Sequence, residues 1–313
     1  ATVEQLLRAG ANKEAACGGM TPLHWALQNG HVAVVPALLT AGANKEAAKP
    51  DGATPLVVAV QKGFAATVEQ LLRAGANKEA ACGATPLIAA ARAGSADAVR
   101  ALLRAGAKVE AVGPAAVTAL GEAAKAGHAD VVRALLDGGA NKDAVSGGCA
   151  PVLIAAEAGK SAVVVMLAAA RCNVNIFGEG RRAPYTPLHW AASLGDVEGA
   201  KALLAAGAVL EAAHSPHGNY GTPLVAAART GRADMIRFLL SCGANKEAES
   251  ASFGTPLYAA AAAGHADAVN VLLAAGANKN ARIHSGTALR AAKTAGHAAV
   301  VAALVAAGAT NAP

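Results

Sequence analysis

Histidine can act in acid–base catalysis or bind a metal, and most of its nine copies in this sequence recur at two fixed places. One place follows a Thr-Pro-Leu triplet, and the other follows a glycine that comes shortly after it. The copies are His24 and His189 at the first place, and His31, His128, His265 and His297 at the second. This repetition argues against a single catalytic site.

His214 and His217 differ, because they lie three residues apart in a segment outside this pattern. Their spacing could supply two metal ligands, but no further ligand cluster lies nearby in the sequence. The five cysteines are far apart and form no Cys-x-x-Cys pair, which argues against a zinc site or a disulfide framework and favours a reducing compartment. We expect no metal and no cofactor.

The other common catalytic motifs are missing too. The sequence has no Gly-x-Ser-x-Gly elbow, no phosphate-binding loop and no carboxylate pair at a plausible cleft, so we expect no enzyme. The net charge is +6, but Lys and Arg are spread singly, mostly beside Glu or Asp, which does not favour nucleic-acid binding. The longest apolar runs fall short of the roughly 20 residues that a membrane helix needs, so no transmembrane segment is expected.

Aromatic side chains gather in one part of the chain. Seven of the nine fall between residues 177 and 258, and Arg181 and Arg182 lie in the same region. Trp, Tyr and Arg dominate binding hot spots, so the cluster favours a partner-binding surface. The alternative is that Trp190, Phe238 and Tyr258 fill the core, while Phe177, Tyr185, Tyr220 and Phe253 pin longer loops.

These residues belong to a chain of near copies of one unit, with a period of about 33 residues. In the copy that begins at Thr186, this threonine can cap a first helix, Pro187 suits its opening position, and Gly195 ends it. Asp196 then opens a second helix, and Gly207 lies just past its end.

The repetition predicts one array over residues 1–313. A half-repeat at 1–20 precedes full helix pairs that start near residues 21, 54, 85, 118, 150, 186, 222, 255 and 287. Ala150 stands where most copies have threonine, which removes a cap worth about 1 kcal/mol. Pro36 lies in a second helix, and we expect it in the opening turn, where proline is tolerated.

The run Thr-Pro-Leu-His-Trp-Ala-Ala at 186–192, with Leu-Leu-Ala-Ala-Gly-Ala at 203–208, closely resembles the ankyrin repeat. The resemblance covers essentially the whole chain. It implies an all-α solenoid of about nine helix-turn-helix pairs plus the half-repeat, with β-hairpin-like fingers. It also implies that the repeated histidines form structural hydrogen bonds between loop and helix. Two fingers, at 176–185 and 212–221, are longer than the rest.

The resemblance further implies a non-catalytic interaction module or scaffold in an intracellular compartment such as the cytoplasm. A protein partner would meet the fingers and the exposed ends of the first helices. The predicted partner-binding residues are Phe177, Arg181, Arg182, Tyr185, Ser193, Leu194, His214, His217, Asn219, Tyr220, Arg229 and Phe253. The alternatives are a structural component of a large multisubunit assembly, or a regulatory array of a longer enzyme or channel polypeptide.

A charged motif, Asn-Lys-Glu-Ala, recurs at Asn12, Asn44, Asn77 and Asn245. We expect stacking to bring its Lys and Glu near those of neighbouring copies, in a solvated ladder worth about 0–1 kcal/mol for each pair. An electrostatic contact strip is the alternative. The last segment, His297–Pro313, is nearly all apolar, and we expect both ends to be covered by further repeats or neighbouring subunits.

Overall fold

The computed structural model describes residues 2–80, 82–177, 185–213 and 221–310. The chain divides into two compact units, Ala1–Pro151 and Val152–Pro313. The first unit contains α1 (Thr2–Arg8), α2 (Pro22–Gln28), α3 (Val35–Thr40), α4 (Pro55–Gln61), α5 (Ala65–Arg73), α6 (Pro86–Ala93), α7 (Ala96–Arg104), α8 (Ala119–Ala126) and α9 (Ala129–Asp137), with the 3₁₀ helices η1 (Val32–Val34) and η2 (Pro114–Ala116).

The second unit carries the remaining helices, the first of which begins at the unit boundary. They are α10 (Pro151–Glu157), α11 (Ser161–Ala169), α12 (Pro187–Leu194), α13 (Val197–Ala205), α14 (Pro223–Arg229), α15 (Ala233–Ser241), α16 (Pro256–Ala262), α17 (Ala266–Ala274), α18 (Ala288–Ala295) and α19 (Ala298–Ala306). In the described residues, α1 is therefore followed by nine pairs of helices.

Threonine hydroxyls begin most of the first helices. Thr186 accepts a hydrogen bond from the backbone N–H of His189 at 3.4 Å, and Thr118 accepts one from Gly121 at 3.1 Å. The same bond forms at Thr54, Thr85, Thr222, Thr255 and Thr287. These bonds satisfy an N–H group that the helix itself leaves unpaired. The predicted caps are confirmed at these positions.

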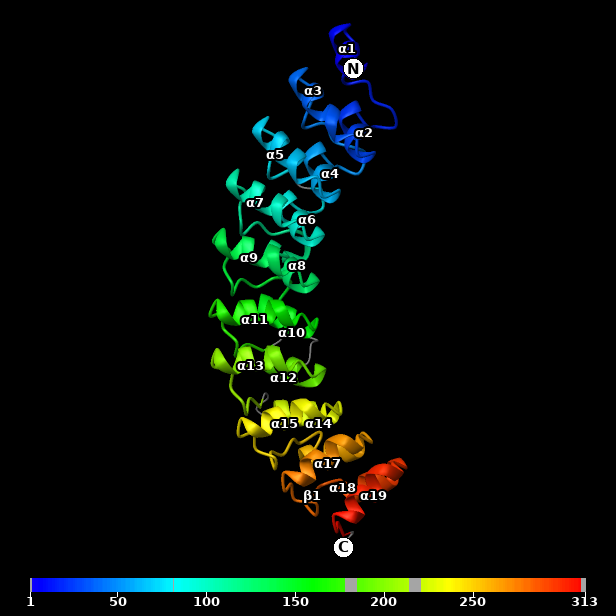
Figure 1. Ribbon diagram of the computed structural model, residues 1–313, viewed down its shortest axis with the longest axis vertical. Helices are drawn as coiled ribbons and strands as arrows, with labels where there is room; N and C mark the ends of the chain where they lie inside the picture. The colour runs from blue at the N-terminus through cyan, green and yellow to red at the C-terminus, as the bar shows by residue number, and fades with distance from the viewer. Residues whose placement is uncertain (1, 81, 178–184, 214–220, 311–313) are drawn as a thin grey trace. The chain divides into compact units, whose positions relative to one another are not determined.

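Helices of neighbouring pairs lie side by side within each unit (Figure 1). In the first unit α4, α6 and α8 form one layer and α5, α7 and α9 the other; in the second unit α12, α14, α16 and α18 face α13, α15, α17 and α19. One leucine in nearly every helix is fully or almost fully buried between the layers, as Leu87 and Leu102 illustrate. Small alanines around these leucines let the short helices pack closely.

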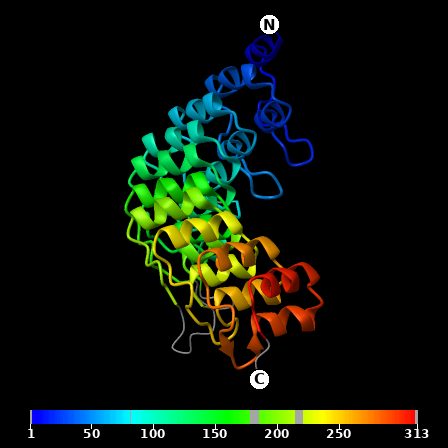
Figure 2. The same cartoon turned by 60° about the horizontal axis from the view of Figure 1, so that its bottom comes forward.

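The fingers between pairs contain little β structure. Arg282–Ile283 (β1) and Gly286–Thr287 (β2) form an antiparallel hairpin, seen in orange in Figure 2. Other fingers are closed by single bridges, such as Cys17 with Met20 and Ser250 with Gly254. Most of the two long fingers lies outside the described residues.

Pro36 lies in the first turn of α3, as expected. The residues before it, Val32–Val34, form the 3₁₀ helix η1, and α3 is only six residues long. Because proline has no N–H group, it fits a helix start, where that group would have no partner within the helix.

The histidines that follow Thr-Pro-Leu are buried connectors between repeats. Nδ1 of His24 lies 2.9 Å from the Thr21 hydroxyl, and Nε2 lies 3.2 Å from the carbonyl oxygen of Ala53 in the next repeat. His189 repeats this arrangement with Thr186 and the carbonyl of Gly221. The structural role implied by the resemblance is confirmed for both.

Three of the histidines that follow the turn glycine contact the preceding repeat instead. His128, His265 and His297 each place Nε2 at 3.1–3.3 Å from a backbone carbonyl oxygen at the end of the preceding first helix. Arg232 occupies the same place in its repeat and donates from Nε to the carbonyl oxygen of Ser193 at 3.1 Å. The repeated histidine pattern did not reveal Arg232, because an arginine stands here in place of the histidine. Its guanidinium makes the equivalent contact with the preceding repeat.

Restoring the missing threonine should stabilise the chain. Ala150→Thr places a hydroxyl at the position where Thr118 and Thr222 form caps, so we expect the free energy of unfolding to rise by about 1 kcal/mol. Thr118→Ala is the matched control and should lower it by a similar amount. Urea denaturation followed by circular dichroism measures both. An Ala150→Thr protein no more stable than wild type would show that the missing cap does not weaken this repeat.

His24 makes the stability depend on pH. Burial, with a smaller effect of the Lys49 charge, lowers the pKa of His24 below its ordinary value of 6.5. The unfolded chain therefore binds this proton more readily, so the free energy of unfolding should decrease as the pH falls below 6.5. His24→Gln should make that decrease shallower, as measured by denaturation at a series of pH values. An unchanged slope would contradict this role.

Candidate partner-binding surface

The Asn-Lys-Glu-Ala motif links neighbouring repeats, but not through the predicted contact between its Lys and the Glu of a neighbouring copy. Instead of meeting a lysine, the Glu46 carboxylate accepts a hydrogen bond from the backbone N–H of Asn77 in the next repeat, at 2.8 Å. Glu14, Glu79, Glu110, Glu211 and Glu247 form the corresponding bond with the next repeat at 2.7–2.8 Å. Charge-assisted bonds to a backbone donor are directional, so they set the stacking of the loops.

The lysine of the motif also reaches the backbone of the next repeat. The Lys246 ammonium donates to the carbonyl oxygen of Ala275 at 2.8 Å, and Lys279 donates to that of Ala307. Both carbonyls lie just past the end of a second helix, where a positive charge is favourable. In the copy that begins at Asn245, the lysine and the glutamate thus both contact the backbone of the next repeat.

Half of the predicted partner-binding residues lie outside the described part of the chain, namely Arg181, Arg182, His214, His217, Asn219 and Tyr220. The other half are Phe177, Tyr185, Ser193, Leu194, Arg229 and Phe253, and all belong to the second unit. The structure brings Tyr185, Arg229 and Phe253 together, while Ser193 and Leu194 lie at the end of the neighbouring helix α12.

Tyr185 packs directly before α12 and is only 6% exposed. Its ring stacks on His189, with ring centroids 5.2 Å apart and the planes within 1° of parallel. It also meets the edge of Trp190, with centroids 5.5 Å apart. This packing holds the end of the long finger against α12, so Tyr185 has the loop-pinning role that was the alternative interpretation.

Arg229, the last residue of α14, joins three consecutive repeats. Its Nη2 donates to the hydroxyl of Tyr185 at 3.5 Å, and its guanidinium carbon lies 5.1 Å from the centroid of the Phe253 ring. Its Nε is buried and has no hydrogen-bond partner among the described residues. The Phe253 ring and the Tyr185 hydroxyl both restrict the guanidinium, which reduces the entropy it would lose on binding a ligand.

Ser193 and Leu194 form the end of α12. The Ser193 hydroxyl donates to the carbonyl oxygen of Trp190 at 3.0 Å, and the residue is buried. Leu194 is 41% exposed. Leu194 and Arg229 are the last residues of two adjacent first helices; in the alignment of the repeats Arg229 matches Ser193, and Leu194 matches Thr230.

Over the described ranges, no three His, Cys, Asp or Glu side chains are grouped so that they could hold a metal ion. The described helices are also all too short or too polar to cross a membrane.

Short helix pairs stacked through shared hydrogen bonds, with different side chains at equivalent surface positions, define a tandem-repeat helical protein. The chain belongs to the ankyrin-repeat family, because the model "Ankyrin repeats (3 copies)" matches residues 1–82, 41–113, 58–146 and 188–283, more than half of the chain. It is similar to the human ASB11 ankyrin repeat domain, a crystal structure, at 30% identity and a TM-score of 0.63. That match covers 73% of this chain and 99% of the ASB11 chain. A search of curated proteins gives no match.

These findings confirm the predicted family and the all-α ankyrin fold. Ankyrin repeats are generally protein–protein interaction modules, which makes a protein the expected class of partner.

Proposed function

We propose that this chain is a non-catalytic module that binds a protein partner through the fingers and first-helix ends of the Val152–Pro313 unit. The observation that carries the proposal is the fixed guanidinium of Arg229, which contacts Tyr185 and the ring of Phe253. Arginine held in this way is a frequent binding hot spot, because its charge and its planar donors are presented without loss of side-chain freedom.

The neighbouring exposed Leu194 supports the same location. An apolar side chain beside an oriented cation provides both area to bury and a group that selects the partner. Residues Phe177 and Phe253 are partly exposed and extend this surface toward the fingers. The six predicted residues that fall outside the described part remain part of the proposal.

Capture experiments with variants test this location. The 313-residue chain is immobilised and should retain specific proteins from a lysate of its native source. Arg229→Ala and Leu194→Asp should each weaken that capture, by roughly thirtyfold if the residue is a hot spot of about 2 kcal/mol. Arg237→Ala is the matched control, since Arg237 is an exposed arginine that pairs with Asp234 within the second helix α15. Quantitative mass spectrometry of the retained proteins gives the readout.

Helical content and thermal unfolding of each variant separate lost binding from lost folding. Retention that is the same for wild type, Arg229→Ala and Leu194→Asp would contradict the proposed surface. The alternative function, a structural component of a larger assembly, predicts instead that the isolated chain associates into higher oligomers in sedimentation experiments. A regulatory array within a longer polypeptide predicts capture of other segments of that same polypeptide.

A further inference from the structure

One repeat has a residue other than glycine just past the end of its second helix, where all the others have glycine. Its residue is Arg171, and its backbone has φ of 58°, in the left-handed region. The equivalent residues of the other repeats are glycines with φ between 75° and 91°, namely Gly10, Gly42, Gly75, Gly106, Gly139, Gly207, Gly243, Gly276 and Gly308. A residue with a side chain is disfavoured in this conformation, whereas glycine is not.

The backbone at Arg171 nevertheless closes the helix in the usual way. Its N–H donates to the carbonyl oxygen of Ala168 at 2.9 Å, and the N–H of Cys172 donates to that of Leu167 at 3.3 Å. Gly207 and Ala208 make the same pair of bonds at the end of α13. The fold therefore calls for glycine at this position, and the arginine side chain is an addition that the backbone does not need.

Arg171 lies at a groove of about 610 Å³ between α11 and α13, which are neighbours in the second unit (Figure 1). Apart from Arg171 and Cys172, the groove is lined by small aliphatic side chains, namely Val165, Ala168, Ala169, Ala202, Ala205 and Ala206. Val165 is 38% exposed. Helix α11 has no charged residue along its whole length, so the groove has one apolar wall.

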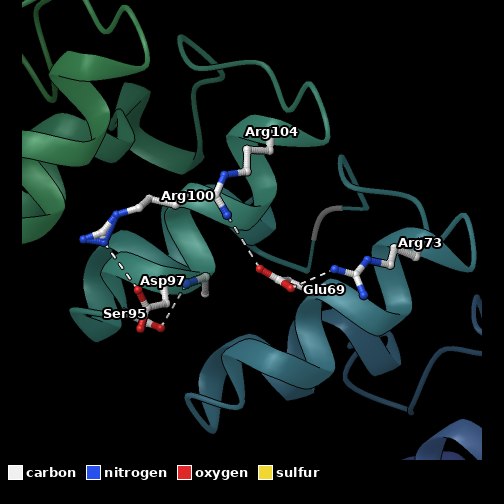
Figure 3. Close-up of polar contacts among 7 residues, drawn as sticks. Glu69, Arg73, Ser95, Asp97, Arg100 and Arg104 are labelled. Carbon is white, nitrogen blue, oxygen red and sulfur yellow. Dashed lines mark hydrogen bonds and ion pairs between the residues drawn. The ribbon is translucent and has the colours of Figure 1, made fainter.

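Other grooves between second helices carry charges of both signs. In the groove between α5 and α7, Glu69 lies between Arg73 and Arg104, with nitrogen–oxygen distances of 3.2 and 3.8 Å (Figure 3). The groove between α15 and α17 contains Arg237 and Asp267. In these grooves the protein supplies its own counter-ions.

The groove between α11 and α13 supplies no counter-ion from its own lining. Arg171 is its one charged lining residue, and across the described residues no ion pair is formed by this guanidinium. An apolar floor with a single unpaired cation at one end is complementary to an apolar group that carries a carboxylate.

We propose that this groove binds an amphipathic helix of a partner protein, with aliphatic side chains against the alanines and an Asp or Glu paired with Arg171. A groove between two helices accepts the ridge of a third helix, and the small alanines allow close approach. Arginine pairs with a carboxylate through two parallel hydrogen bonds, which fixes the register of the bound helix. This surface is formed by second helices and is separate from the first-helix surface proposed above, so either can fail alone.

Three synthetic amphipathic helices test the proposal. They share an alanine-leucine face and differ only at one flanking position, which is Glu, Gln or Lys. Fluorescence anisotropy with the full chain should rank their affinities as Glu above Gln above Lys. Arg171→Gly should weaken binding of the Glu peptide about tenfold, as expected for a lost charge-assisted bond. Arg171→Lys should retain part of the affinity, and Ala205→Glu should abolish it by placing a competing carboxylate in the groove.

Arg237→Ala, at the groove between α15 and α17, is the matched control and should leave binding unchanged. Because Arg171→Gly restores the residue used by the other repeats, its thermal unfolding temperature should not fall, so lost binding cannot be attributed to lost folding. Equal affinity for the Glu and Lys peptides, absence of binding, or unaltered binding by Arg171→Gly would overturn the proposal. A dimer of the chain that Ala205→Glu dissociates would also overturn it, since a second copy would then occupy the groove.

Discussion

Each helix pair exposes an apolar face and several backbone groups that only the next pair can cover, and this constraint governs the whole structure. A pair of helices of seven to nine residues, such as α6 and α7, is too small to bury its own leucines. Stacking buries them. The same stacking gives hydrogen-bond partners to backbone groups of the loops. Glu46 accepts a hydrogen bond from the N–H of Asn77, and His24 lies within hydrogen-bonding distance of the carbonyl of Ala53. Contacts between repeats therefore stabilise the structure more than contacts within a single repeat.

This arrangement separates the residues that build the array from those free to recognise a partner. Side chains that recur are occupied by contacts with the adjacent repeat, as His128 is with the carbonyl of Arg92. Side chains that differ between equivalent positions are not required in every repeat, although Arg229 and Arg232 also contact adjacent repeats. Leu194 and Arg229 differ at the ends of adjacent first helices, and Arg171 differs at the end of a second helix. Departures from the repeat are accordingly the places where function is proposed.

Sequence periodicity was sufficient to predict the helices, because the same few residues start and stop each one. Thr186 and Pro187 at the start, Gly195 at the end and Pro36 in an opening turn act locally, within one turn of helix. The pairing of Lys and Glu was wrong since both side chains found backbone partners across the repeat boundary. The signs of the side-chain charges do not show that a backbone N–H or carbonyl group will be the partner.

The candidate sites were only partly predictable. The clustering of aromatics and arginines indicated the region of Arg229, but the contacts with Tyr185 and Phe253 depend on three repeats being stacked. The replacement of glycine by Arg171 is visible in the sequence once the repeats are aligned. Its meaning required the backbone angle and the uncharged wall of α11, which follow from packing.

Native-state hydrogen exchange tests most directly the claim that repeats are held by contacts with their neighbours. Removing one such contact by Glu46→Ala should accelerate exchange of the Asn77 amide about tenfold, consistent with the loss of a hydrogen bond to a charged acceptor. Helices α8 and α9, further along the same unit, should exchange as in wild type. Asp97→Ala, which removes an ion pair with Arg100 within α7, is the control and should leave Asn77 unchanged. Unaltered exchange at Asn77, or equal acceleration across the whole unit, would contradict the account.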